Sequence, residues 1–194
     1  MIYLASQSPR RQELLRQLGV SFEIVDVELV EQRKPLELPA EYVSRVARDK
    51  AVAGLSRLAG YKDAIVLGAD TDVVVDDDVL GKPANSAEAH AMLQRLSGRR
   101  HEVLSSVWLV SEIQQLHYTV ATWVTFGAMS DAEINAYIAT GEPFGKAGAY
   151  AVQGKAAAFI ENIEGSFSGV MGLPLHETYR MLRNFNVPFW SDPT

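Results

Sequence analysis

The segment S-Q-S-P-R-R near the N-terminus combines residue types that suit a phosphate ligand. Ser8 followed by Pro9 predicts a helix start, with Ser8 as the N-cap and Pro9 in the first turn. A helix N-terminus presents unpaired backbone N–H groups and a partial positive charge. Arg10 and Arg11 add full charges there, and Ser6 adds a second hydroxyl. The segment predicts an anion site, although a capped helix with two solvated arginines explains these residues equally well.

An acidic residue follows a strongly apolar run in the first half of the chain. The run A-I-V-L-G, residues 64–68, is typical of a strand covered on both faces, and Asp70 stands at its expected carboxyl end. Ligands of α/β sheets bind at such strand ends, whereas G-A-D-T can also form an ordinary turn. A carboxylate facing a polyphosphate could hold a divalent cation or take a proton from water, and Glu31 is a candidate second acid.

Two lysines are candidate partners for the phosphates. Lys50 lies at the border of the apolar face of a helix expected over residues 40–58, and Lys82 lies in the loop G-K-P. Either lysine could instead be structural, with a stem covering apolar surface. A close pair of opposite charges is worth about 1 kcal/mol in water and about 4 kcal/mol at an effective dielectric near 20. Cations that converge in a shielded cleft would therefore bind a triphosphate far better than cations on an open surface.

The strands and helices that must position these residues alternate along the chain. This order predicts an α/β fold with mixed strand directions. We expect one domain over residues 1–194, with two lobes. Strands are expected at 2–5, 21–28, 64–68, 101–110, 116–126, 159–163 and 167–170, with a hairpin through 76–78. Helices are expected from Pro9 to Gly19, over 40–58, from an N-cap at Ser86 to near Gly98, from a capping box of Ser130 and Glu133 to Gly141, and after Pro174.

Composition narrows the class of protein. The chain has 194 residues, of which 47% are hydrophobic and 22% charged, as in ordinary soluble domains. Its formal net charge of −6 argues against a protein that coats nucleic acid. Cysteine is absent, which excludes disulfides and thiolate metal sites and favours a reducing compartment. We find neither a secretory signal pattern nor an apolar run long enough to span a bilayer, so a cytoplasmic protein without membrane attachment is expected.

Three familiar catalytic patterns are excluded by their details. The stretch from Gly148 to Lys155 has the wrong spacing for a Walker A motif, and Ala156 replaces its Ser or Thr. In G-S-F-S-G, Phe167 stands where a nucleophile elbow needs serine. The four histidines show no metal-ligand spacing; they are His90, His101, His117 and His176.

Several short motifs nevertheless occur in one order over nearly the whole chain. They are Ser6-x-Ser8-Pro9-Arg10-Arg11, Lys50, Gly68-Ala69-Asp70-Thr71, Gly81-Lys82-Pro83, Gly148-x-Tyr150-x-x-Gln153-Gly154 and Gly172-Leu173-Pro174. In this order they resemble the Maf family of nucleotide pyrophosphatases. The resemblance implies a mixed, twisted sheet flanked by helices, related to the fold of the inosine triphosphate pyrophosphatases, with the substrate in a central cleft between two lobes.

The resemblance also implies an activity, namely hydrolysis of a nucleoside triphosphate to the monophosphate and pyrophosphate with Mg²⁺ or Mn²⁺. The acid matching Asp70 would accept the proton, and the metal would lie at Asp70 and Glu31. The Glu31 loop, E-L-V-E-Q-R, lacks the adjacent acidic pair common in relatives. The expected phosphate-binding residues are Ser6, Ser8, Arg11, Lys50 and Lys82. A homodimer is a further expectation from the family.

Within the family, three positions are associated with substrate choice, and here they hold Arg10, Thr71 and Gln153. This combination resembles the branch acting on dTTP and UTP, and modified pyrimidine nucleotides are further candidate substrates in a house-cleaning role. The branch acting on 7-methyl-GTP typically has Trp, Gln and Glu there. The amide of Gln153 can donate and accept, as the imide edge of uracil or thymine requires. Two alternatives are a nucleotide-sensing regulator of septum formation and a purine pyrophosphatase of the inosine triphosphate type.

Overall fold

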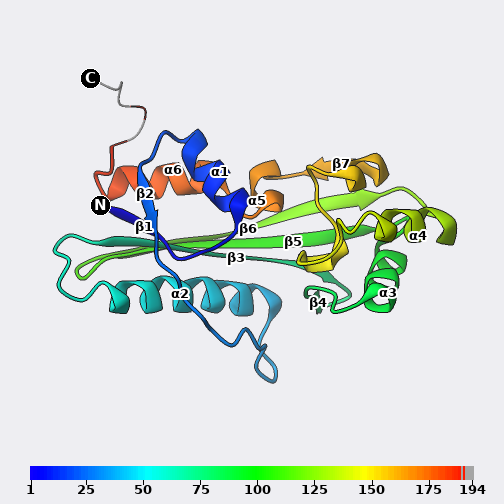
Figure 1. The fold of residues 1–194 in the computed structure, drawn as a ribbon, viewed down its shortest axis with the longest axis horizontal. Helices are drawn as coiled ribbons and strands as arrows, with labels where there is room; N and C mark the ends of the chain where they lie inside the picture. The colour runs from blue at the N-terminus through cyan, green and yellow to red at the C-terminus, as the bar shows by residue number, and fades with distance from the viewer. Residues whose placement is uncertain (189, 191–194) are drawn as a thin grey trace. The chain divides into compact units, whose positions relative to one another are not determined.

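A computed structural model describes residues 1–188 and 190, and its strands form a mixed sheet in the order β2-β1-β3-β5-β6-β7, with β4 paired to β3 (Figure 1). Strand β1 runs parallel to β2 and β3, whereas the β3–β4 and β6–β7 pairs are antiparallel. The expected α/β class with mixed strand directions is confirmed.

The longest connection in the first half of the chain runs over residues 25–38 and carries Glu31. The strands are β1 (Ile2–Leu4), β2 (Phe22–Ile24), β3 (Ile65–Val75), β4 (Asp78–Leu80), β5 (Arg100–Val110), β6 (Gln115–Phe126) and β7 (Ile160–Glu164). The α-helices are α1 (Pro9–Gln17), α2 (Pro39–Arg57), α3 (Ser86–Leu96), α4 (Asp131–Ala139), α5 (Phe167–Met171) and α6 (Leu175–Asn184), and two 3-10 helices are η1 (Ala147–Ala149) and η2 (Lys155–Phe159). No helix in the described part of the chain has the length and apolar character that crossing a membrane requires.

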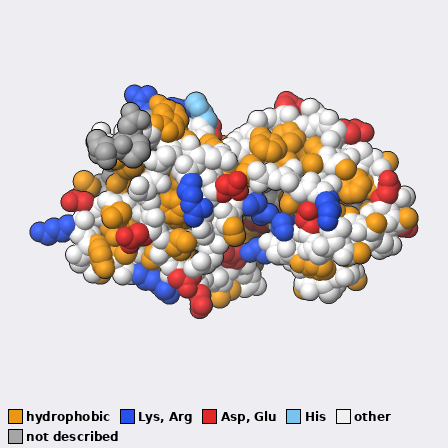
Figure 2. Space-filling view, turned by 45° about the horizontal axis from the view of Figure 1, so that its top comes forward, with side chains coloured by type: hydrophobic (Ala, Val, Ile, Leu, Met, Phe, Trp, Pro, Cys, Tyr) orange, Lys and Arg blue, Asp and Glu red, His pale blue; other side chains and the backbone are white. Residues whose placement is uncertain are grey.

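The chain divides into two compact units, in agreement with the two expected lobes. The first unit holds Met1–Asp70, Ser105–Val120 and the described residues from Gly172 onward. The second unit holds Thr71–Leu104 and Ala121–Met171. Acidic, basic and hydrophobic side chains are interspersed on the face drawn in Figure 2.

In the first unit, helices cover both faces of the strands. Helix α2 lies on one side, and α1 and α6 lie on the other (Figure 1). The apolar stripe expected on α2 is confirmed, because Val43, Val46 and Ala47 are fully buried. Leu14 and Leu15 bury the matching face of α1. The buried residues of α2 fix this helix, and with it Lys50, against the sheet.

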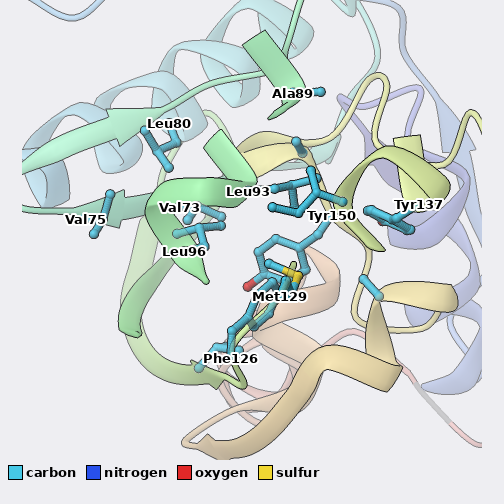
Figure 3. Packing of buried hydrophobic residues seen from close by; sticks show 14 of the residues in the cluster. Val73, Val75, Leu80, Ala89, Leu93, Leu96, Phe126, Met129, Tyr137 and Tyr150 are labelled. Carbon is cyan, nitrogen blue, oxygen red and sulfur yellow. The ribbon is translucent and has the colours of Figure 1, made fainter. Parts of the chain in front are cut away.

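The second unit has its own core, in which aromatic rings from distant segments meet (Figure 3). The ring of Tyr150 packs edge-on against Phe126 at 4.9 Å and against His101 at 5.5 Å between centroids. The Tyr150 hydroxyl shares a 2.9 Å hydrogen bond with His101 Nε2. Burial lowers the pKa of His101 to about 4, so the ring is neutral at pH 7. Tyr150 is therefore a fixed anchor for the loop that follows it.

Two expected elements are wrong in kind or in detail. The strand expected over residues 167–170 is the helix α5, because the hydroxyl of Ser166 accepts the backbone N–H of Gly169 at 3.0 Å, as an N-cap does. The segment F-S-G-V is too short for its residue pattern to distinguish a strand from a helix. The N-cap of α3 is Asn85 rather than Ser86, since Asn85 Oδ1 accepts the N–H of Glu88 at 2.9 Å.

Candidate functional site

Asp70 lies in the middle of a strand rather than at its end. Strand β3 continues to Val75, because residues 73–75 pair with β4. The polar residues Asp70, Thr71 and Asp72 therefore interrupt the apolar pattern without ending the strand. The Asp70 residue is only 6% exposed, and burying a carboxylate is costly unless it is paired and hydrogen-bonded.

Lys50 supplies that pairing and brings two acids together. Its Nζ lies 2.8 Å from Asp70 Oδ1 and 2.6 Å from Glu31 Oε1. The side chains of Lys50 and Asp70 are 12% and 9% exposed, so their interaction is little screened by water. Lys50, Asp70 and Glu31 thus meet in one cluster, and their roles in binding phosphate and metal stay predictions. The cluster holds two carboxylates and one ammonium group.

Gly68 allows the close approach of helix and strand on which this cluster depends. A Cβ atom at residue 68 would overlap the backbone carbonyl oxygen of Ala47 and come within 2.6 Å of the backbone nitrogen of Ala51. Helix α2 and strand β3 are thus in backbone contact beside the cluster. The glycine of G-A-D-T is required by packing, because no side chain fits there.

We expect Gly68→Ala to lower the free energy of unfolding by about 1–3 kcal/mol, because the added methyl forces α2 away from β3. The same shift separates Lys50 from Asp70, so activity should fall as well. Urea unfolding measures the stability. Gly81→Ala is the matched control, because its added methyl meets no atom within 4 Å. Equal stability of the two variants would contradict the packing argument.

The loop that carries Glu31 is tied down by an ion pair that sequence spacing does not reveal. Arg45, on α2, contacts both carboxylate oxygens of Glu37, with Nε 2.5 Å from Oε1 and Nη2 2.9 Å from Oε2. Its Nη2 also donates to the carbonyl oxygen of Gln32 at 3.0 Å. The hydrogen bonds from Arg45 lower the pKa of Glu37 to about 2, so the pair stays charged at neutral pH. One helix thus provides both Lys50 and the residue that holds the Glu31 loop.

The N-terminal segment forms a capped helix, as expected. Ser8 is the N-cap of α1, and its Oγ accepts the N–H of Arg11 at 3.5 Å. Ser6 Oγ accepts from the Ser8 N–H at 3.3 Å and from Arg11 Nη1 at 3.2 Å. Arg11 Nε donates to the carbonyl oxygen of Gly172 at 2.9 Å. Arg11 therefore ties α1 to the turn before α6, and phosphate binding by Ser6, Ser8 and Arg11 stays a prediction.

Arg10 has a different environment from Arg11. Its side chain is half-buried, and burial lowers its pKa. Among the described residues, no acceptor lies within hydrogen-bonding distance of its buried Nε atom. A buried donor on a cation is costly without a partner, so an acceptor supplied by a ligand would stabilise this side chain.

Three further candidates belong to the second unit. Lys82 is exposed, and the loop before it is held by the hydrogen bond from the Gly148 N–H to the carbonyl oxygen of Gly81 at 3.1 Å. Gln153 is exposed in the turn that precedes η2, and Thr71 is half-buried on β3. Substrate contacts of Thr71, Lys82 and Gln153 stay predictions.

The carboxylates at Lys50 suit a metal that arrives with its substrate. In the described part of the chain, no group of three or more Asp, Glu or His side chains is arranged to hold a metal ion. Asp70 and Glu31 supply two hard oxygen ligands beside one another, however. Mg²⁺ is commonly held by one or two carboxylates together with substrate phosphates, and this donor set fits that arrangement.

The chain matches one protein family over nearly its whole length. The family model described as Maf-like protein matches residues 1–185. A dTTP/UTP pyrophosphatase of Xanthomonas oryzae pv. oryzae is 53% identical over 187 residues, covering 95% of this chain and 98% of the relative. Another from Escherichia coli O157:H7 is 50% identical over 185 residues, covering 95% and 93%. A solved dITP/XTP pyrophosphatase of Mycobacterium abscessus matches with a TM-score of 0.41 and 16% identity, over 64% of this chain and 73% of that one.

Proposed function

Because this chain belongs to the Maf family, we propose that it is a nucleoside triphosphate pyrophosphatase that hydrolyses dTTP and UTP to the monophosphate and pyrophosphate. Two relatives at least 50% identical over nearly the full chain bear the name of this activity. The observation that carries the proposal is the cluster in which Lys50 joins the buried Asp70 to Glu31. Modified pyrimidine nucleotides are further candidate substrates in a house-cleaning role.

Asp70 accepts the proton of the attacking water in this proposal. Its carboxylate is held by Lys50 Nζ through Oδ1, which orients the group. A positioned carboxylate of this kind contributes about 10²- to 10⁴-fold to a proton-transfer step. A Mg²⁺ or Mn²⁺ ion at Asp70 and Glu31 would neutralise charge on the phosphates.

The cations hold the polyphosphate. An ammonium group has three donors, and two of those on Lys50 contact the carboxylates, so the third suits a phosphate oxygen. Lys82, Arg11 and the hydroxyls of Ser6 and Ser8 supply further donors. The N-terminus of α1, capped by Ser8, adds its partial positive charge.

Substrate choice falls to Arg10, Thr71 and Gln153 in this proposal. The buried Nε of Arg10, which has no acceptor in the described part of the chain, is supplied with one by the substrate. Gln153 is exposed and both donates and accepts, which matches the neutral imide edge of uracil and thymine.

We also propose that the protein is a homodimer in the cytoplasm and that it binds neither membranes nor nucleic acid stably. The net charge of −6 disfavours stable binding to nucleic acid. The lack of cysteine is typical of a protein in a reducing compartment such as the cytoplasm.

We expect Gln153→Glu to shift preference away from UTP and dTTP and towards 7-methyl-GTP, because a carboxylate cannot donate to a uracil carbonyl but suits a cationic base. The loss of a hydrogen bond to the correct base should lower kcat/KM for UTP by about tenfold or more. Steady-state kinetics on the three nucleotides measure the shift. Gln114→Glu, which makes the same chemical change at an exposed turn, is the control. An unchanged order of preference would refute the role of Gln153.

The proposal is tested by incubating the pure protein with Mg²⁺ or Mn²⁺ and a panel of nucleotides. The panel contains dTTP, UTP, CTP, GTP, ITP and 7-methyl-GTP, and pyrophosphate and orthophosphate are measured separately. We expect pyrophosphate, chiefly from dTTP and UTP. Preference for ITP would identify a purine pyrophosphatase instead, and binding without hydrolysis would identify a nucleotide sensor.

A further inference from the structure

Glu142 makes a set of contacts in the second unit that the proposed mechanism does not use. It lies in the turn after α4. Its Oε1 accepts hydrogen bonds from the Tyr137 hydroxyl at 2.9 Å and from the backbone N–H of Ala156 at 3.3 Å. Its Oε2 accepts the backbone N–H of Lys155 at 2.9 Å. One carboxylate thus holds the first two N–H groups of η2, directly after the loop that carries Gln153.

The same carboxylate lies close to the backbone of Gly154. A Cβ atom at Gly154 would overlap the carboxylate oxygens of Glu142 in the position that their hydrogen bonds give them. The φ of Gly154 is −106°, so no left-handed conformation calls for glycine here. A side chain at residue 154 would instead have to displace the end of the Glu142 side chain. Glu142 lies directly against the residue that follows Gln153.

The electrostatics keep Glu142 ionised and in place. Burial raises the pKa of Glu142, but the hydrogen bonds from Lys155, Tyr137 and Ala156 and the charge of Lys146 outweigh burial and lower it overall. Lys146 Nζ in turn donates to the carbonyl oxygen of Glu142 at 2.8 Å. An ionised carboxylate only accepts hydrogen bonds, so it matches the three donors that face it.

The Gln153 loop is consequently fixed on both sides. Before Gln153, the buried Tyr150 is bound to His101 through its hydroxyl. After Gln153, Lys155 and Ala156 are bound to Glu142. The amide of Gln153 is exposed between these two fixed points. A loop held in this way fixes the backbone position from which the Gln153 side chain extends, and a preorganised backbone lowers the ordering cost of recognition.

We propose that Glu142 is a positioning residue for base selection, which holds the Gln153 loop in the conformation that recognises uracil or thymine. This inference rests on the proposed function, in which Gln153 contacts the base. Glu142 acts through the loop and makes no contact with substrate. Its loss should therefore affect recognition of the base more than the chemical step.

The test compares Glu142→Gln with the wild type. The amide keeps the shape but replaces one acceptor oxygen with a donor, which then faces a donor of the loop. We expect kcat/KM for UTP relative to 7-methyl-GTP to fall about tenfold, mainly through KM for UTP, since a tenfold loss corresponds to one displaced contact. Glu164→Gln is the control, because it removes the same charge from an exposed ion pair with Arg100. Tyr137→Phe leaves both backbone contacts of Glu142 in place and should change selectivity less than Glu142→Gln does.

Two further variants separate failure of this inference from failure of the proposed function. Gln153→Ala should abolish the selectivity, and adding Glu142→Gln to it should change selectivity little further, because both act through one side chain. If Gln153→Ala leaves selectivity intact, the base role of Gln153 is wrong and the inference falls with it. If Gln153→Ala abolishes selectivity but Glu142→Gln does not reduce it, only the positioning inference is overturned.

Amide hydrogen exchange tests, without measuring activity, whether Glu142 holds the loop that follows Gln153. We expect the N–H groups of Lys155 and Ala156 to exchange faster in Glu142→Gln than in wild type or in Glu164→Gln. Unchanged exchange at both amides would show that Glu142 does not hold the loop and would overturn the inference.

Discussion

Replacing Asp70 with asparagine should lower the rate of dTTP hydrolysis by about 10³-fold or more, because an amide cannot take a proton from water. It is also a weaker metal ligand than a carboxylate. The fold should remain, since asparagine has the same shape and Lys50 keeps its 2.6 Å contact with Glu31. Release of pyrophosphate measures the rate, and urea unfolding checks the fold.

The matched control for this variant is Asp49→Asn. Asp49 is a partly exposed acid on α2 that pairs with Arg45 at 3.4 Å, so its loss removes one carboxylate from the same unit without touching the cluster. We expect its rate to stay within about twofold of wild type, since exposed ion pairs contribute little. An Asp70→Asn variant that hydrolyses dTTP at the wild-type rate would rule out Asp70 as the proton acceptor.

Replacing Lys50 with methionine should lower the free energy of unfolding by about 3 kcal/mol, because it leaves the buried carboxylate of Asp70 without its cation. The aliphatic part of the side chain is kept, so packing changes little. The double variant Lys50→Met with Asp70→Asn should recover much of this loss, since no uncompensated charge then remains. Urea unfolding of the four proteins of this cycle measures the coupling.

Lys50→Met should also reduce kcat/KM for dTTP by about 10²-fold, because in the proposed site a charge that binds the phosphates is lost. Lys50→Arg keeps the charge and should retain more activity. If the two single variants destabilise additively in the double variant, Lys50 and Asp70 are not energetically coupled. That outcome would contradict a stabilising ion pair between Lys50 and Asp70.

Local periodicity predicted the helix and the strand that carry Lys50 and Asp70. Lys50 follows Val43 by seven residues and Ala47 by three, which places it at the border of the buried face of α2. The run before Asp70 is a buried strand, as its composition indicated. The ion pair between Lys50 and Asp70 was not predicted, because it joins a helix and a strand that are twenty residues apart in the chain.

The residues that support the site could not be predicted, because hydrogen bonds between distant segments leave no local pattern. Arg11 and Gly172 are 161 residues apart in the chain, and Glu142 holds the amides of Lys155 and Ala156 through tertiary contact alone. Neither pairing has a characteristic spacing. The continuation of β3 beyond Asp70 was missed for a related reason, because it depends on pairing with β4.

Analysis of the products of dTTP in a single turnover tests the central claim most directly. Excess protein is mixed with dTTP and Mg²⁺, and the nucleotide and phosphate products are quantified together. We expect dTMP and pyrophosphate in equal amounts from wild type, and neither from Asp70→Asn over the same time. Formation of dTDP and orthophosphate, or equal product from the variant, would contradict a pyrophosphatase that acts through Asp70.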